Sequence, residues 1–164
     1  METYPQCFFE RINMVKLIEV TEENWLDIAR LSVTDEQQAF LDRPIGIIAR
    51  GYVYRNCNAR VIGIKNDAQI VGVALVRDLS EEPACYDLQQ FMIDRRFQNK
   101  GYGCDALMLI IESLKREGRY NCVEVCVNKA DASALRAYEK VGFVDTGYID
   151  DDAPDCLNLM YYFR

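Results

Sequence analysis

The sequence predicts an α/β (α+β) fold in which strands and helices are mixed along one chain. Three observations predict it: a strand–helix–strand unit over residues 87–128, a hairpin that turns at Asn66 and Asp67, and amphipathic helical periodicity after two of the strands. A length of 164 residues suits one domain with a buried core, and no linker, repeat or low-complexity tract divides the chain. We therefore expect one domain over residues 14–164. Residues 1–13 are either an N-terminal extension of it or the product of an upstream start.

Seven β-prone runs separated by turn residues give the predicted strands. They cover residues 14–20, 60–64, 69–77, 87–93, 121–128, 144–149 and 157–163. The second and third form the hairpin, and a polar loop over residues 79–85 leads into the fourth. In the run 121–128 three valines alternate with Cys122, Glu124 and Cys126, so Glu124 faces away from the valines.

Apolar periodicity and capping residues give the predicted helices. The longest covers residues 102–117, with apolar side chains at 104, 107, 108, 111 and 114 and a stop at Gly118. A helix starting near Thr21 should bury a stripe that contains Trp25, Ile28, Ala29 and Leu31. Two more are expected, from Pro44 to about Arg55, and from a cap at Asp131 to a stop at Gly142. The strands at 87–93 and 121–128 flank the longest helix in a β-α-β unit and should therefore be parallel.

Charge and composition argue against several classes of function. Lys and Arg total 19 against 26 Asp and Glu, a net charge of −7, and a negative field repels nucleic acid. No apolar run reaches the roughly 20 residues that span a bilayer, and the start has no signal-peptide core. We expect a cytoplasmic protein that binds neither nucleic acid nor membrane. The same charge suits a cationic substrate such as an amine, although solubility alone would also account for it.

Cysteine and histidine usage restricts the chemistry further. Seven cysteines occur without a CxxC pair, and histidine is absent. These facts argue against a zinc site, against any metal centre of that kind, and against Cys–His or Ser–His catalysis. Proton transfer must therefore use Asp, Glu, Tyr, Lys, Cys or water.

The turn before the longest helix has the features of an anion site. It contains Gly101 and Gly103 together with Arg95, Arg96 and Lys100. A helix N-terminus exposes unpaired N–H groups, glycines let the main chain approach an anion closely, and cations add positive potential. An ordinary strand–helix turn would look similar. The spacing is neither GxGxxG nor GK[ST], which argues against NAD and ATP.

Two segments resemble signatures of the GNAT superfamily of acyl-CoA N-acyltransferases. Residues 98–103, Gln-Asn-Lys-Gly-Tyr-Gly, fit [RQ]-x-x-G-x-[GA] between a strand and a helix. Residues 128–143 resemble the N-x-x-N-x-x-A-x-x-x-Y-E-K-x-G-F run, except that Asp131 stands where the family usually has Asn. The resemblance covers residues 14–164. It implies a mixed, mostly antiparallel sheet of six to seven strands, with helices on both faces and a splayed central pair of parallel strands.

The resemblance also implies a site for acetyl-CoA. The main chain of residues 91–93 would pair with the pantetheine arm, and an N–H there would polarise the thioester carbonyl. Tyr138 would protonate the departing thiolate, although its place on the helix equally suits a core tyrosine. The implied cofactor-binding residues are Phe91, Met92, Ile93, Arg96, Gln98, Asn99, Lys100, Gly101, Tyr102, Gly103, Asn128, Asp131 and Lys140. At Asp131 a carboxylate would lack the donors of the amide, so helix capping is the firmer role.

The acceptor is expected to be a small-molecule amine that attacks the thioester directly. Residues 88–103 and 36–40, the latter in the first helical region, resemble bacterial spermine/spermidine (diamine) acetyltransferases. At Gln89 and Gln90, however, close relatives often carry an aromatic residue and an arginine. The residues considered for the substrate side are Glu36, Gln37, Glu81, Glu82, Gln89 and Glu124, and each glutamate also fits a solvated surface. No single residue stands out as the general base.

Two other functions stay open at this point. One is an N-acetyltransferase for a protein or peptide amine, and the other is a non-catalytic module that binds acyl-CoA as a sensor. Turnover separates the sensor from the enzymes, and activity on peptides separates the enzymes from each other. Dimers are frequent in the family, so a homodimer is a further possibility.

Overall fold

The computed structural model describes residues 15–164, and the extension over residues 1–13 and the predicted strand start at Met14 lie outside them. Within the described part, seven strands form one sheet in the order β1-β2-β3-β4-β5-β7-β6. The strands are β1 (Lys16–Glu19), β2 (Arg60–Lys65), β3 (Ile70–Leu79), β4 (Cys85–Ile93), β5 (Cys122–Asn128), β6 (Val144–Asp145) and β7 (Cys156–Tyr162). Only β4 and β5 pair in parallel among them, and the other neighbours are antiparallel. The predicted fold class is confirmed.

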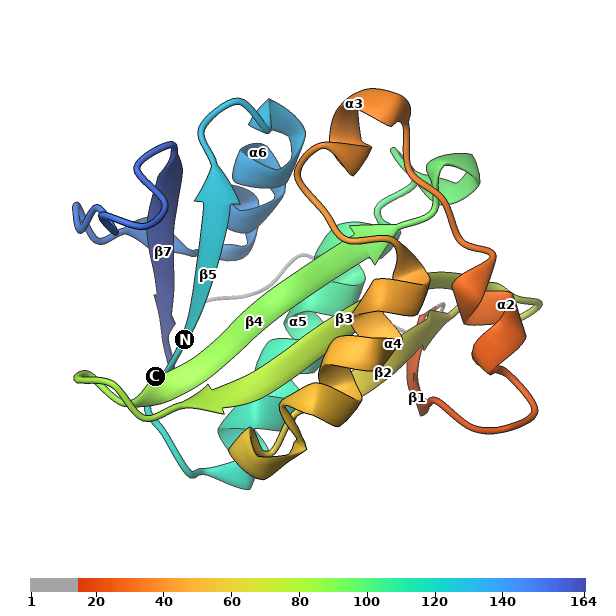
Figure 1. The fold of residues 1–164 in the computed structure, drawn as a ribbon, viewed down its shortest axis with the longest axis horizontal. Coiled ribbons are helices and arrows are strands. Elements are labelled where there is room, and N and C mark those ends of the chain that lie inside the picture. Colours follow the sequence, from red (N-terminus) through yellow and green to blue (C-terminus); the bar gives the residue numbers. More distant parts are fainter. Residues whose placement is uncertain (1–14) are drawn as a thin grey trace, which may run out of the picture.

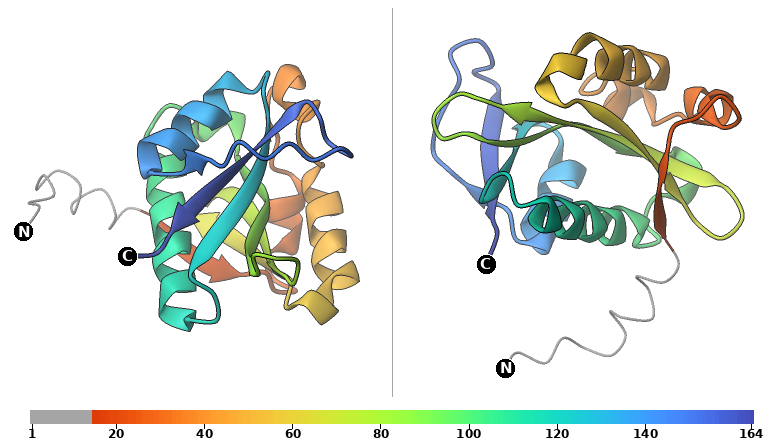
Figure 2. Two further views of the ribbon diagram at one scale, coloured as in Figure 1. Left: turned by 90° about the vertical axis from the view of Figure 1, so that its left-hand side faces the viewer. Right: turned by 90° about the horizontal axis from the view of Figure 1, so that it is seen from below.

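Helices cover both faces of this sheet (Figure 1). They are α2 (Trp25–Ala29), α3 (Asp35–Gln38), α4 (Pro44–Val53), α5 (Tyr102–Glu117) and α6 (Ala132–Val141), with short 3-10 turns η1 (Arg55–Cys57) and η2 (Arg95–Phe97). Figure 2 shows α4 and α5 on opposite sides of the sheet. None of the helices in residues 15–164 is long and apolar enough to cross a membrane.

The inner strand β3, which pairs with β2 and β4, is buried on both faces. Ala74 and Val76 pack into the core under α5 and α6, whereas Val73 and Leu75 pack with α2 and α4. Successive side chains of a strand point to opposite faces, so a strand with helices on both sides needs apolar residues at every position. The run 70–76 meets this requirement and holds the two layers together.

The parallel pair β4–β5 separates along its length. The two strands pair at only two positions, Tyr86 with Val123 and Asp87 with Glu124. Two residues further along β4, a β-bulge makes Gln89 the extra residue between the pairs Val76–Leu88 and Leu75–Gln90. Beyond the bulge β4 stays with β3, while β5 follows β7 (Figure 1). The predicted splay is confirmed.

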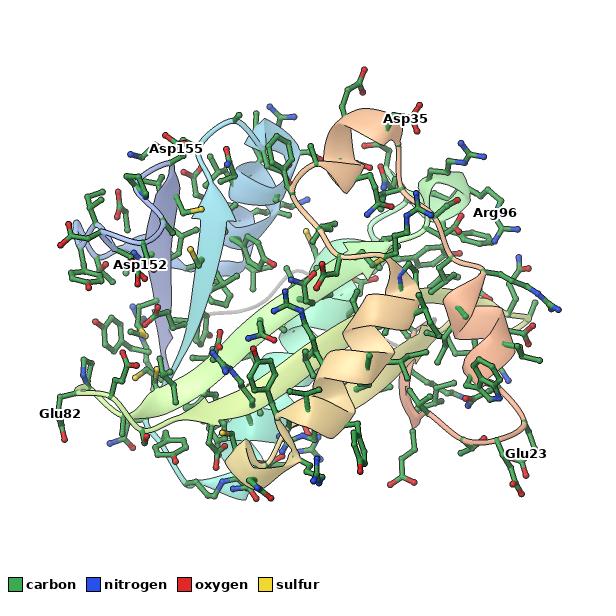
Figure 3. The ribbon with its side chains drawn as sticks, in the orientation of Figure 1. Glu23, Asp35, Glu82, Arg96, Asp152 and Asp155 are labelled. Atoms are coloured by element: carbon green, nitrogen blue, oxygen red, sulfur yellow. The ribbon has the colours of Figure 1, made fainter. Side chains whose placement is uncertain are left out.

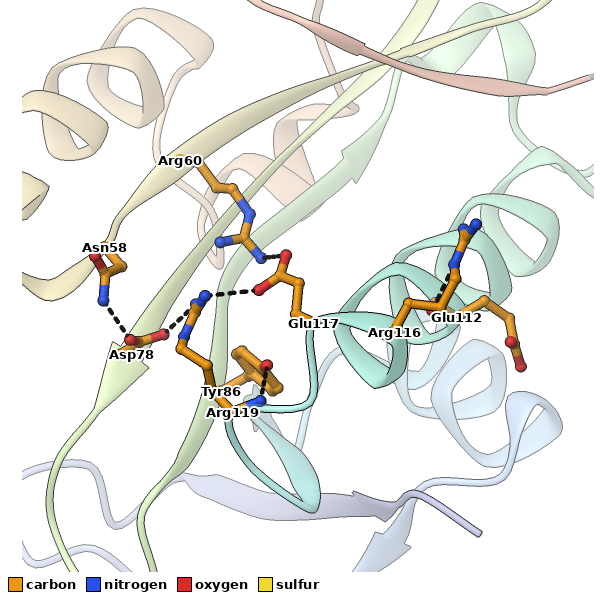
Figure 4. A network of polar contacts seen from close by, with 8 residues as sticks. All are labelled: Asn58, Arg60, Asp78, Tyr86, Glu112, Arg116, Glu117 and Arg119. Atoms are coloured by element: carbon orange, nitrogen blue, oxygen red, sulfur yellow. Dashed lines mark hydrogen bonds and ion pairs between the residues drawn. The ribbon is translucent and has the colours of Figure 1, made fainter.

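A polar network ties the layers together at the end of the sheet where β4 and β5 still pair (Figure 4). Asp78 in β3 accepts from Arg119 Nη2 at 2.9 Å and from Asn58 Nδ2 at 2.6 Å. Arg119 also pairs with Glu117 at 3.0 Å, and Glu117 pairs with Arg60 in β2. The network therefore joins β2 and β3 to the C-terminal end of α5.

Several predicted element boundaries are wrong. The first helix starts at Trp25 after Asn24, and the Thr21 hydroxyl accepts from Glu23 N instead of capping the helix. Trp25 is 39% exposed, because the helix has barely more than one turn and only Ile28 of its residues is fully buried. The expected loop 79–85 is shorter, since Leu79 and Cys85 pair with each other as strand residues.

Two further segments differ from their predicted form. Of the segment 36–40, expected within the first helical region, residues 36–38 lie in the separate short helix α3 that starts after the N-cap Thr34, and residues 39–40 form the turn after it. The expected strand 144–149 keeps only two residues as β6. Gly147 adopts a φ of 73°, and Asn158 binds Thr146 and Tyr148, which turns the chain away from the sheet.

Candidate functional site

A cavity of about 470 Å³ lies among three parts of the chain: the region around α3, the end of β4 with the turn that follows it, and α6, which follows β5. Its wall comes from residues 33–41, from the end of β4 with the turn 97–104, and from α6. The predicted site residues that line it are Gln37, Phe91, Met92, Ile93, Gln98, Asn99, Lys100, Gly101, Gly103, Asp131, Tyr138 and Lys140. Residues far apart in sequence therefore meet at one cavity.

The turn over residues 98–104 presents a run of unbonded main-chain donors. Asn99 and Gly101 have positive φ values of 59° and 89°, which turn successive peptide units without forming a helix. Among the described residues, no hydrogen-bond acceptor is found for any main-chain N–H from 98 to 104. The last three belong to the first turn of α5, where the helix dipole adds positive potential. This arrangement can bind a phosphate group without any catalytic metal.

Cations surround the cavity unevenly. Lys100, Arg136 and Lys140 line it, together with the single carboxylate Asp131. Arg96 is not among the lining residues and points outward in Figure 3. It pairs instead with the buried carboxylate of Asp94, Nε to Oδ1 at 2.8 Å.

Asp94 is the reason Arg96 is held away from the cavity. Burial favours the neutral acid, but hydrogen bonds from Arg96 and from the main chain of Ser32 outweigh it and lower the pKa of Asp94. A buried carboxylate that stays ionised needs its cation, so Arg96 serves this ion pair.

Tyr138 lies on α6 with its ring buried between Phe91, at 6.4 Å between ring centroids, and Phe143, at 5.2 Å. Its hydroxyl makes no hydrogen bond to residues 15–164, and no fully buried side-chain polar atom there lacks a partner, so the hydroxyl reaches accessible space. Burial, and then the charge of Asp131, raise the pKa of the phenol. Tyr138 is therefore a neutral proton donor on the cavity wall.

The end of α6 fixes the place of Tyr138. Phe143 N donates to Tyr138 O at 3.0 Å, and Gly142 N donates to Glu139 O at 3.1 Å. With Gly142 at a φ of 116°, this is the predicted Schellman ending, which lets Phe143 pack back onto the ring.

The start of α6 also confirms a predicted cap. Asp131 Oδ1 accepts from Ala134 N at 3.1 Å. Asn128 is not among the lining residues, because its side-chain oxygen accepts from Ala130 N at 2.9 Å and shapes the turn into the helix. The ring of Tyr102 likewise packs on the core beside Phe97, and only its main chain belongs to the turn 98–104.

Glu124 lies on the face of β5 opposite the valines, beside Asp87 of β4. Burial raises the pKa of Glu124, and the negative charges of Asp87, Glu81 and Asp150 raise it further. Burial also raises the pKa of Asp87, although Arg77 at 2.8 Å opposes this. An excess of negative charge therefore gathers where the two strands begin to part.

The remaining candidates on the substrate side lie apart from the cavity. Glu36 is exposed on α3, whereas its neighbour Gln37 lines the cavity. Figure 3 shows Glu82 on the turn between β3 and β4, at the other end of β4 from Arg96. Gln89, in the bulge, lies 3.2 Å from the Arg77 guanidinium when its amide oxygen is turned toward it.

Several lining residues were not predicted. Ser133, Arg136 and Ala137 share the cavity side of α6 with Tyr138 and Lys140. Helical periodicity counted from Lys140 could have found them, because residues three, four and seven positions apart share one face of a helix. Val33 and Leu41 line the cavity too, but no sequence pattern places them there, because the fold of the segment between α2 and α4 decides it. Within residues 15–164, no three His, Cys, Asp or Glu side chains are grouped so that they could hold a metal ion.

Comparisons with known proteins identify the family of the chain and structures that share its fold. The family model described as "Acetyltransferase (GNAT) family" matches residues 19–143. A spermine/spermidine N(1)-acetyltransferase of Bacillus subtilis (strain 168) is 24% identical over 141 residues, which cover 80% of this chain and 88% of that protein.

Solved structures share the fold at low identity. Spermidine N-acetyltransferase from Vibrio cholerae, solved with CoA and spermine, gives a TM-score of 0.71 at 13% identity over 91% of this chain and 95% of that one. The ribosomal-protein-S18-alanine N-acetyltransferase of Escherichia coli gives 0.67 at 16% identity over 92% and 94%. At these identities the likeness establishes the fold alone.

Proposed function

The chain belongs to the GNAT family of acetyltransferases, and from this premise we propose that it transfers the acetyl group of acetyl-CoA to a primary amine of a polyamine such as spermine or spermidine. The observation that carries the proposal is the run of free N–H groups at residues 98–104 on the same cavity as Tyr138. Free N–H groups that can hold a diphosphate and a neutral phenol that can protonate a departing thiolate lie on one cavity, which suits acyl transfer from CoA.

The residues at the cavity fit CoA. Main-chain donors at 98–104 would hold the diphosphate, with Lys100, Arg136 and Lys140 adding positive charge. Beyond Asp87, the edge of β4 on the side of β5 has no strand partner among the described residues, so residues 91–93 can pair with an extended arm. When bound, acetyl-CoA would supply an acetyl group activated as a thioester.

Tyr138 is the proposed general acid. A phenol carries its proton at neutral pH, and burial raises the pKa of Tyr138 further. Its hydroxyl has no competing partner in residues 15–164. Phe91 and Phe143 hold the ring in place, so the proton is presented from a fixed position at the cavity wall.

Negative charge where β4 and β5 begin to part supports a polycation as the acetyl acceptor. Asp87, Glu81 and Asp150 act electrostatically on Glu124, and the whole chain carries a charge of −7. An alkylamine is mostly protonated at neutral pH and must lose a proton before it attacks. Glu124, with its raised pKa, is the proposed acceptor of that proton. Similarity to the B. subtilis enzyme supports the same class of substrate.

The test is acetyl transfer measured over a panel of acceptors: spermine, spermidine, monoamines, aminoglycosides and peptides. CoA release should be quantified chromatographically, since Cys57 and Cys126 are exposed free thiols that would react with a thiol reagent. We expect turnover with spermine and spermidine to exceed turnover with monoamines. Turnover of peptides alone would replace the polyamine proposal, and CoA binding without turnover of any acceptor would indicate a sensor.

A further inference from the structure

Two glutamine side chains join α3 to the turn 98–104. Gln37 Nε2 donates to Gln98 Oε1 at 3.2 Å, and Gln98 Nε2 donates to Gln37 Oε1 at 2.9 Å. Each amide both donates to and accepts from the other, so the pair has a defined geometry and carries no charge. Both side chains line the cavity. We call this pair of hydrogen bonds the glutamine bridge.

Apolar packing supports the wall at its two ends, where Val33 is buried and Leu41 packs against the same core cluster. Helix α3 has four residues, none of them buried, and begins at the capping box formed by Thr34 and Gln37. At its two ends the segment is tethered to β4 and its following residue: Ser32 N donates to Asp94 Oδ2 at 2.9 Å, and Asp42 N donates to Gln90 Oε1 at 3.1 Å. Between these tethers, the glutamine bridge provides the hydrogen bonds that link residues 33–41 to the rest of the described chain.

Gln98 takes part in both the turn and the wall. Its main-chain N–H is the first of the run of free donors, and its side chain also donates to Ile93 O at 2.9 Å. An anion that fixes the peptide unit of residue 98 also fixes the origin of the side chain that holds Gln37. A ligand on the turn can therefore restrict the α3 wall without touching it.

We propose that Gln37 and Gln98 are positioning residues that couple the cofactor turn to the α3 wall, so that binding of a CoA diphosphate at residues 98–104 orders residues 33–41. The identity of the ligand rests on the proposed function. Because coupling between two sites is reciprocal, an acceptor that contacts the ordered wall binds more tightly once CoA is present. By the same reciprocity, CoA binds more tightly once that acceptor is present, so the bridge favours the complex that holds both ligands.

Hydrogen exchange with and without CoA tests the coupling directly. In the wild-type protein, CoA should slow exchange of the turn 98–104 and of the segment 35–41, the latter about fivefold, the equivalent of one net hydrogen bond. In Gln98→Ala and in Gln37→Ala, CoA should still protect the turn, because the donors there are main-chain groups, but the protection of segment 35–41 should disappear.

Two variants serve as matched controls. Gln38→Ala removes a side chain of the same helix that binds only Leu41 O within the segment, at 2.8 Å. Thr34→Val removes the capping hydroxyl but leaves both glutamines, which separates loss of the bridge from loss of the cap. Both controls should keep the protection of segment 35–41 by CoA.

The possible outcomes distinguish a failure of the proposed coupling from a failure of the proposed function. If calorimetry shows CoA binding but segment 35–41 is protected equally in wild type and Gln98→Ala, or in neither, the coupling is refuted while the proposed function stands. If CoA does not bind the wild-type protein, both are refuted. A rise of the KM for the acceptor in Gln37→Ala, with an unchanged Kd for CoA and an unchanged kcat, would further support positioning.

Discussion

The side chain of Tyr138 combines a buried ring with a hydroxyl that no residue in 15–164 binds. A tyrosine that only filled the core would gain from a hydrogen-bond partner, so the free hydroxyl is better explained by a ligand. We expect Tyr138→Phe to lower kcat about 100-fold, the usual contribution of a general acid, and to change the Kd for CoA less than about twofold. Steady-state kinetics with calorimetry would measure both. Wild-type kcat in the variant would remove Tyr138 from the mechanism.

Glu124 gives a pH-dependent prediction at the same scale. Burial and then Asp87, Glu81 and Asp150 raise its pKa in the folded protein. A raised carboxyl pKa stabilises the fold while the group is protonated, and this contribution is lost as pH rises through the folded pKa. Glu124→Gln should therefore raise Tm by a few degrees at pH 8 and by less at pH 4, since about 1 kcal/mol corresponds to roughly 2–4 °C in a chain of this size.

Thermal melts of the variant across this pH range would measure the effect. Glu22→Gln, at an exposed position before α2, is the matched control and should leave Tm unchanged. An equal Tm for wild type and Glu124→Gln at every pH would mean that Glu124 is fully solvated. The same variant should lose activity on polyamines. A higher Tm together with lower activity would show that the Glu124 carboxylate destabilises the fold but serves the reaction.

At the scale of elements, the turn 98–104 depends on one backbone conformation. Gly101 has a φ of 89°, which a residue with a side chain adopts only under strain, whereas a Cβ on Gly103 would meet Ile93 Cγ1 at an ordinary 3.6 Å. Gly101→Val should displace the donors and weaken CoA binding at least about tenfold, while Gly103→Ala should keep it within about threefold. Calorimetric titration with CoA would decide. Equal affinities would show that the diphosphate does not bind at this turn.

The elements also show what the sequence could predict. Helix α5 was predicted with its observed ends, because apolar periodicity, the turn before Tyr102 and the stop at Gly118 all agree. Strand β6 was predicted too long, because β-prone residues after Asp145 are turned away by contacts with Asn158, which is distant in sequence. Local patterns predict an element only where no distant partner competes.

The same distinction holds for the cavity. The turn 98–103 and Tyr138 were predicted from two motifs that resemble GNAT signatures, and the structure brings them to one cavity, although their roles stay predictions. Arg96 was expected there because it is a cation near the turn, but Asp94, a buried carboxylate, binds it elsewhere. Gln37 was named for the substrate side, yet its pairing with Gln98 follows only from the tertiary fold. The two glutamines are 61 residues apart, so no local pattern links them. Asp94 is only two residues from Arg96, but its burial, which makes the ion pair necessary, follows only from the tertiary fold.

At the scale of the molecule, the sheet consists of two parts that share only two paired positions, at Tyr86 and Asp87. The separation makes room for the cavity, but it removes main-chain hydrogen bonds from the middle of the sheet. Contacts at the end of the sheet where β4 and β5 still pair must therefore hold the two parts in register. Arg119 contributes there, because its main-chain N–H donates to Tyr86 Oη at 3.0 Å and its guanidinium pairs with Asp78 and Glu117.

Arg119→Ala tests whether this end of the sheet can be weakened independently of the site. Its side chain is 38% exposed, so two ion pairs together should contribute only about 1 kcal/mol. We expect Tm to fall by roughly 2–4 °C and denaturation to stay cooperative.

The Kd for CoA should not change, because the lost contacts lie at the other end of β4 from the cavity. Arg116→Ala, whose guanidinium binds the carbonyl of Glu112 in the same helix and no other group in residues 15–164, should leave Tm nearly unchanged. A weaker Kd for CoA in Arg119→Ala would instead mean that strain at the paired end reaches the cavity through β4, and the two ends of the splayed sheet could not be treated as independent.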